Sequence, residues 1–150
     1  MLTAGQPAPD IPLPPGAGAT SLAELVAAAG QPVLVYFYPA DFSPLCAAQA
    51  CMIDRRRRRG EAHIPAIGVS PQGQRSHNAF ARLFGLEAVL VSDPDRAIAR
   101  AWGVAGALGA VRRATFVVGP DMRIADAAMA DFRLAPHRRV VQRLAERSGA

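Results

Sequence analysis

Two cysteines, Cys46 and Cys51, directly follow a strongly apolar segment and are the only cysteines of the chain. Ser43 and Pro44 precede them and are typical of a helix start, because serine caps a helix and proline fits its first position. Cys46 is then the third residue of the predicted helix, where backbone N–H groups have no partner within the helix. These groups and the helix dipole favour a thiolate and can hold an anionic leaving oxygen. The sequence therefore predicts a nucleophilic Cys46.

The spacing of the two cysteines bears on whether they can form a disulfide. In a regular helix, Cα atoms of residues five apart lie roughly 8–9 Å from each other, whereas a disulfide needs about 4.4–6.8 Å. Either the cysteines never pair, or the helix unwinds locally during function. In the second case Cys51 would capture an oxidised Cys46, turning a sulfenic acid into a disulfide and preventing over-oxidation. The spacing alone leaves both alternatives open.

Three further residues are candidates for the same site. Pro39 shapes the chain where it leaves the apolar segment, and the Ser43 hydroxyl could orient an oxygen-bearing substrate. Arg113 precedes a predicted strand over 115–118 and could approach Cys46, where a guanidinium would stabilise a thiolate and a departing oxygen. Each residue also has a purely structural alternative. Ser43 could be a simple helix cap, Arg113 an ordinary charge beside a strand, and Cys46 an inert buried thiol.

Strands and helices alternate along the chain, which indicates an α/β sandwich with a mixed central sheet. The expected helices begin at Ser21, Pro44, Arg75 and Pro136, and a further helix follows the turn 92–95 and runs through Trp102. The expected strands are 33–38, 64–69, 88–91, 115–118 and a hairpin segment over 122–129. The helix over 75–84 is expected to present Ala79, Phe80, Leu83 and Phe84 on one apolar face.

Length and composition bound the class of protein. With 150 residues, 51% of them apolar, the chain is expected to form a single domain over 1–150 with a real core. No apolar run reaches the ~18–20 residues of a membrane span, and no secretory signal is visible at Met1–Asp10, so we expect a cytoplasmic protein without a membrane partner. The few, scattered histidines and cysteines predict no metal site.

The net charge of +5 rests entirely on arginine, because the 17 basic residues include no lysine. Arg55–Arg59 form an uninterrupted run, which permits a nucleic-acid interpretation. We interpret the run as a solvated helix end instead, because no interleaved aromatic residues or base-reading motif accompany it. No nucleic-acid partner is therefore expected.

The pattern Pro39-x-x-x-Ser43-x-x-Cys46 resembles the active-site motif of peroxiredoxins of the AhpC/TSA family. The second cysteine, Cys51, resembles that of the Q-type group, the bacterioferritin comigratory proteins, in which it resolves the first within one chain. The resemblance continues in family order through Ile67-Gly68-Val69-Ser70, Phe84-Gly85-Leu86, Leu90-Val91-Ser92-Asp93-Pro94, Trp102-Gly103-Val104 and Arg113-Ala114-Thr115-Phe116.

The resemblance implies a thioredoxin-like fold and a thiol-dependent peroxidase that reduces hydrogen peroxide and alkyl hydroperoxides. Cys46 would become a sulfenic acid and Cys51 would condense with it, while Pro39, Ser43 and Arg113 complete the catalytic site. A thioredoxin- or glutaredoxin-type protein would reduce the disulfide. Neither a metal, haem nor any other cofactor is implied, and the chain would be a monomer or weak dimer.

Some positions depart from the family pattern. Leu45 stands where the Q-type group usually has glycine, and the segment 105–111 is shortened, so Arg112 is a possible substitute for Arg113. Gln49 could position the arginine. Two other functions stay open: a thiol–disulfide oxidoreductase, although the Cys-x-x-Cys spacing is absent, and a non-catalytic thioredoxin-like redox sensor or arginine-rich binding module.

Overall fold

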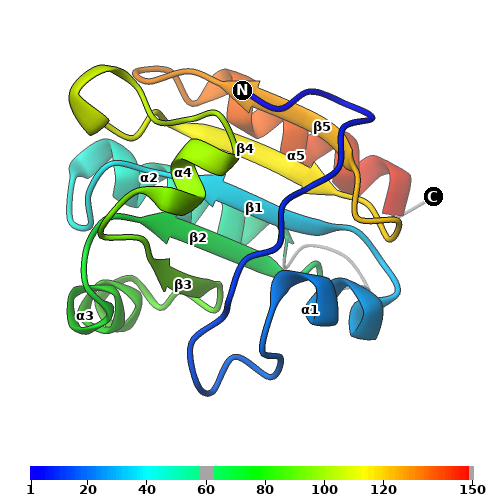
Figure 1. The fold of residues 1–150 in the computed structure, drawn as a ribbon, viewed down its shortest axis with the longest axis horizontal. Coiled ribbons are helices and arrows are strands. Elements are labelled where there is room, and N and C mark those ends of the chain that lie inside the picture. The colour runs from blue at the N-terminus through cyan, green and yellow to red at the C-terminus, as the bar shows by residue number, and fades with distance from the viewer. Residues whose placement is uncertain (58–62, 149–150) are drawn as a thin grey trace.

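A computed structural model describes residues 1–57 and 63–148 and shows a five-stranded sheet with helices on both faces (Figure 1). The helical elements are α1 (Leu22–Ala29), α2 (Pro44–Arg57), α3 (Gln74–Phe84), α4 (Ala97–Ala101), the 3-10 turn η1 (Ala107–Gly109) and α5 (Ala135–Ser148). The strands are β1 (Val33–Phe37), β2 (Ala66–Ser70), β3 (Val89–Ser92), β4 (Ala114–Val118) and β5 (Ile124–Met129). The predicted α/β class and order of elements are confirmed.

The strand order is β3-β2-β1-β4-β5, so β1 lies in the centre of the sheet. β1 runs parallel to β2 and antiparallel to β4, which makes the sheet mixed, as predicted. Successive side chains of a strand point to opposite faces. Val33, Val35 and Phe37 of β1 therefore join the core under α1 and α4, whereas Leu34 and Tyr36 join a second core under α2, α3 and α5.

The register of β1 and β4 brings two distant segments together. Phe37, the last residue of β1, pairs with Ala114, the first residue of β4. The chain leaves β1 toward α2 at the same point where it enters β4 from Arg113. The pairing therefore places the start of α2 beside the residues that precede β4.

Hydrogen bonds at their first residues mark where two of the helices begin. Ser21 accepts a hydrogen bond from the backbone N–H of Glu24 at 3.2 Å, so the predicted capping of α1 is confirmed. The carbonyl of Ser43 accepts from the N–H of Ala47 at 2.8 Å, and α2 starts at Pro44 as expected. Both cysteines consequently lie within one helix.

The predicted apolar face of α3 is wrong. Leu83 is 66% exposed, Phe84 is 38% exposed and Ala79 is exposed, whereas the helix buries His77 and Phe80. The physical reason is the position of α3 beside β3 at the edge of the sheet, where it covers a narrow strip of core. A polar residue takes a place on the buried strip because it has buried polar partners, described below.

None of the helices in the described ranges 1–57 and 63–148 is both long and apolar enough to cross a membrane. Of the arginine run, Arg58 and Arg59 lie outside the described residues. Arg55 and Arg56 belong to the last turn of α2, which agrees with the predicted helix end.

Candidate active site

The thiol of Cys46 lies against the guanidinium of Arg113. Cys46 is fully buried in the first turn of α2, and Nη1 of Arg113 lies 3.2 Å from its Sγ atom. Arg113 itself is 4% exposed, so solvent screens this contact little. A buried guanidinium at this distance stabilises negative charge on the sulfur and on an oxygen that leaves from it.

The chain after β5 holds Arg113 in place. The Nε atom of Arg113 donates to the carbonyl oxygen of Asp131 at 3.0 Å, and its backbone N–H donates to the Asp131 carboxylate at 3.2 Å. Arg112 points elsewhere, because its guanidinium pairs with the same carboxylate at 2.8 Å. The hydrogen bond from Arg112 is the main reason why the pKa of Asp131 lies below its usual value. Of the two candidate arginines, Arg113 contacts Cys46.

A chain of buried side chains continues from Arg113 to α5. Nη1 of Arg113 donates to Oε1 of Gln49 at 2.8 Å, and Nε2 of Gln49 donates to the Thr115 hydroxyl at 3.4 Å. The Thr115 hydroxyl lies 2.9 Å from Nδ1 of His137, and Nε2 of His137 lies 2.9 Å from the carbonyl of Ala130. Gln49 thus contacts the arginine, as the sequence suggested.

The acceptors at each end determine the direction of these hydrogen bonds. A carbonyl oxygen only accepts, so His137 carries a proton on Nε2, and in its neutral form the ring accepts the Thr115 hydroxyl at Nδ1. The Thr115 oxygen then accepts from the amide of Gln49, which turns the carbonyl of Gln49 toward Arg113. A neutral His137 therefore fits the orientation of every group between it and Cys46.

Sequence reasoning missed Thr115 and His137. A signal existed for Thr115, because residues two apart on an extended chain share a face, and Arg113 was already a candidate. His137 had no local signal, since it reaches the site only through the packing of α5 on β4 and β5.

We expect His137 to make the folded protein sensitive to mild acid. Burial, and then the charge of Arg113, lower the pKa of His137 below its ordinary value near 6.5. The unfolded chain therefore binds this proton more readily than the folded protein does. Stability should be complete above about pH 6.5 and fall as the pH drops further, before the carboxylates titrate near pH 4. Urea unfolding between pH 7.5 and 5 measures this loss.

The matched control is His137→Asn, whose side-chain oxygen can accept from Thr115 but does not titrate. This variant should lose the pH dependence between pH 6.5 and 5 while keeping the dependence below pH 4.5. An unchanged slope in the variant would assign the acid sensitivity to another group.

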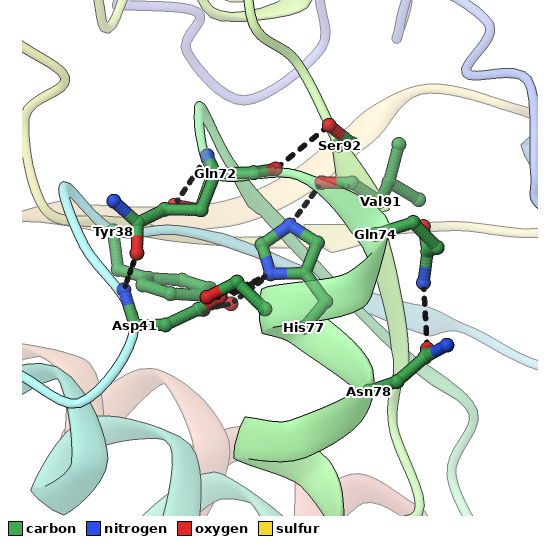
Figure 2. A network of polar contacts seen from close by, with 10 residues as sticks. Tyr38, Asp41, Gln72, Gln74, His77, Asn78, Val91 and Ser92 are labelled. Carbon is green, nitrogen blue, oxygen red and sulfur yellow. Dashed lines mark hydrogen bonds and ion pairs between the residues drawn. The ribbon is translucent and has the colours of Figure 1, made fainter.

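The loop between β1 and α2 is tied to α3 by a second buried network (Figure 2). The Asp41 carboxylate accepts from the Tyr38 hydroxyl at 2.7 Å and from the Ser76 hydroxyl at 2.7 Å. Nδ1 of His77 lies 2.8 Å from the same carboxylate, and Nε2 of His77 lies 3.0 Å from the carbonyl of Val91. These contacts connect the loop before α2 to the first turn of α3 and to the end of β3.

Asp41 and His77 form a fully buried polar contact. Both side chains are 0% exposed, and the two ring nitrogens of His77 lie against the Asp41 carboxylate and the carbonyl of Val91. Burial alone would raise the pKa of Asp41, but the hydrogen bonds from His77, Ser76 and Tyr38 outweigh it and lower the pKa. The carboxylate therefore stays ionised at neutral pH.

This network holds the loop that contains two further predicted site residues. Pro39 is exposed and Ser43 is half-buried, and both belong to the loop that Asp41 anchors. Phe42 in the same loop adopts a left-handed backbone conformation with φ of 63° and packs edge-on against Phe80 of α3. A bulky residue in that conformation is strained, so the contacts around it must hold the loop in place.

Cys51 lies on another side of α2. α2 is continuous from Pro44 to Arg57, and both cysteines are free thiols. A step of five residues along the helix separates them by about 140° around the axis and by roughly 8–9 Å between Cα atoms. The half-buried Cys51 has its pKa raised by burial, an effect that the charge of Arg55 partly offsets. As the spacing predicted, the intact helix keeps the two cysteines too far apart for a disulfide.

Comparison with known proteins adds a consistent set of relatives. A sequence profile of the AhpC/TSA family matches residues 4–127. A putative peroxiredoxin of Mycobacterium tuberculosis is 39% identical over 134 residues, which is 82% of either chain. The chloroplastic peroxiredoxin Q of Gentiana triflora is 45% identical over 76 residues, which is 50% of this chain and 35% of that one.

Solved structures resemble the whole chain. Peroxidoxin BcpB of Mycobacterium tuberculosis superposes with a TM-score of 0.82 at 26% identity and covers 98% of both chains. The bacterioferritin comigratory protein of Xanthomonas campestris superposes with a TM-score of 0.75 at 25% identity, over 98% of this chain and 99% of that one. The predicted thioredoxin-like architecture is confirmed by these similarities.

Proposed function

Because this chain belongs to the AhpC/TSA family of peroxidases, we propose that Cys46 is its peroxidatic cysteine and Cys51 its resolving cysteine. The observation that supports this assignment is the 3.2 Å contact between Nη1 of Arg113 and the sulfur of Cys46 in the first turn of α2. The substrates would be hydrogen peroxide and alkyl hydroperoxides. The trapped intermediate and alkyl peroxide reduction named for the Xanthomonas campestris protein agree with this substrate class.

In the first step the Cys46 thiolate attacks one oxygen of the peroxide. A sulfur–oxygen bond forms as the oxygen–oxygen bond breaks, and the leaving oxygen departs with the electron pair and takes up a proton. Arg113 and the free N–H groups at the start of α2 stabilise the negative charge that develops on this oxygen. Ser43 would orient the peroxide, and Pro39 would shape the chain where it leaves β1 toward the site.

In the second step Cys51 attacks the sulfur of the Cys46 sulfenic acid and releases water. The resulting disulfide requires the segment of α2 between the cysteines to unwind, because the helix holds them apart. A dithiol protein of the thioredoxin or glutaredoxin type would then reduce the disulfide by exchange and return both thiols.

The burial of Cys46 argues against the alternative of a general thiol–disulfide oxidoreductase. Exchange with a protein disulfide needs an accessible attacking thiol, whereas Cys46 is fully buried in the wound helix. A peroxide has the small size that such a site can admit. The contact between Arg113 and the Cys46 sulfur argues against the other alternative, a non-catalytic redox sensor or binding module.

Intact-mass measurement after one equivalent of hydrogen peroxide tests the assignment. The wild-type protein should lose two hydrogen atoms as the disulfide forms. Cys51→Ser should instead gain one oxygen atom, because the sulfenic acid on Cys46 has no resolving partner. Cys46→Ala should keep its mass.

A Cys46→Ala variant that still consumes peroxide at the wild-type rate would overturn the role of Cys46. Dimedone trapping of the Cys51→Ser product provides the control, since it labels a sulfenic acid and no other oxidised state of cysteine. A disulfide that forms between two chains rather than within one would overturn the intramolecular role of Cys51.

A further inference from the structure

A cavity of about 310 Å³ lies between α2 and the start of α5, outside the site around Cys46. Its lining combines three apolar and three basic side chains: Ala48, Met52, Leu134, Arg55, Arg56 and Arg138. The basic residues include the described beginning of the arginine run, for which the peroxidase reaction has no use.

The described lining of this cavity does not balance its positive charge. Among residues 1–57 and 63–148, no acidic side chain lines the cavity and the three arginines form no salt bridge. Arg55 donates one weak hydrogen bond, at 3.4 Å, to the carbonyl of Cys51. Guanidinium groups pair with phosphate and carboxylate oxygens in a bidentate manner. We propose that this cavity, called here the arginine cavity, binds a small phosphorylated or polycarboxylate molecule.

The arginine cavity is coupled to the state of α2, an inference that rests on the proposed function. Ala48 lies between the two cysteines, and Met52 and Arg55 follow them in the same helix. Unwinding α2 to form the Cys46–Cys51 disulfide therefore removes part of the lining. A ligand that binds only the intact helix multiplies the ratio of intact to unwound α2 by the factor 1 + [L]/Kd. The bound anion should therefore slow disulfide formation.

The contact of Arg55 with Cys51 adds a second effect in the same direction. Arg55 partly offsets the raised pKa of the Cys51 thiol. An anion paired with Arg55 cancels part of this positive charge, which leaves less of the resolving cysteine as thiolate. The Cys46 sulfenic acid then persists longer and is exposed to further oxidation by peroxide.

Inorganic pyrophosphate is a suitable probe, titrated by calorimetry into the reduced protein at constant ionic strength. Wild-type protein should bind it, and the double variant Arg56→Ala/Arg138→Ala should bind at least tenfold more weakly. Arg139→Ala is the matched control, because Arg139 is exposed on α5 but does not line the cavity. With pyrophosphate at ten times its Kd, disulfide formation after a peroxide pulse should slow up to about tenfold. This slowing should occur in the wild type and in Arg139→Ala but not in the double variant.

Three results would overturn the proposal. Equal pyrophosphate affinity in the double variant would show that pyrophosphate binds elsewhere. Binding without slower disulfide formation would show that the arginine cavity is not coupled to α2. Tighter binding of a single-stranded oligonucleotide than of pyrophosphate would assign the arginines to nucleic acid. If pyrophosphate binds as expected but Cys46 does not react with peroxide, the proposed function fails while the anion site stands.

Discussion

Replacing Arg113 by methionine is expected to lower the rate constant for oxidation of Cys46 by hydrogen peroxide by roughly 10²–10³-fold. The buried guanidinium lies 3.2 Å from the sulfur and, in the proposed reaction, would stabilise the charge on the departing oxygen. Methionine keeps much of the side-chain volume but supplies neither the charge nor the donors. Stopped-flow measurement of free thiol against peroxide concentration gives the rate constant directly.

Arg112→Met is the matched control for this prediction. Arg112 forms a half-exposed pair with Asp131, and such pairs contribute about 1 kcal/mol or less. We expect the rate constant of Arg112→Met to fall less than about fivefold, because 1.4 kcal/mol corresponds to a tenfold change and the pair contributes less. This small loss would arise because Asp131, which also binds Arg113, is held less firmly. Equal losses in the two variants would show that the general positive charge, rather than the contact with Cys46, supports the reaction.

Replacing Asp41 by alanine is expected to lower the free energy of unfolding by about 3–5 kcal/mol. The substitution leaves the imidazole of His77 buried without its carboxylate and removes the acceptor of the Tyr38 and Ser76 hydroxyls. Each buried group left without its partner costs about 1–3 kcal/mol. Urea unfolding at pH 7, followed by circular dichroism, measures the change.

Ser76→Ala removes one hydrogen bond from the same carboxylate and keeps the Asp41–His77 contact. Its expected loss is about 1 kcal/mol, the usual value for one such bond. If Asp41→Ala unfolds at the same urea concentration as Ser76→Ala, the Asp41 carboxylate does not hold the loop as proposed.

Local patterns were sufficient for the order of elements and for the core of the site. Ser43 and Pro44 predicted the start of α2, and Cys46 follows from that start. The choice between Arg112 and Arg113 needed the structure, because neighbouring residues on an extended chain point to opposite sides and sequence alone did not fix which side faces Cys46.

Tertiary packing decided what the sequence could not show. The apolar residues of α3 predicted a wide buried face, but the helix lies at the edge of the sheet and leaves Leu83 and Phe84 exposed. His77 and His137 are held in the core by polar partners that are distant in the sequence. His77 contacts Val91, 14 residues away, and His137 contacts Thr115, 22 residues away. A period of hydrophobicity carries no information about such polar partners.

The partners of Cys46 come from two groups of elements with different freedom. Gln49 belongs to α2, whereas Arg113, Thr115 and His137 belong to β4, its approach and α5. The proposed unwinding of α2 between the cysteines breaks neither the bonds from Arg113 to Asp131 nor the contacts of Asp41 with the preceding loop. In the proposed cycle, the sheet and α5 would therefore keep their half of the site in place, and the reduced segment would fold back against it as a helix.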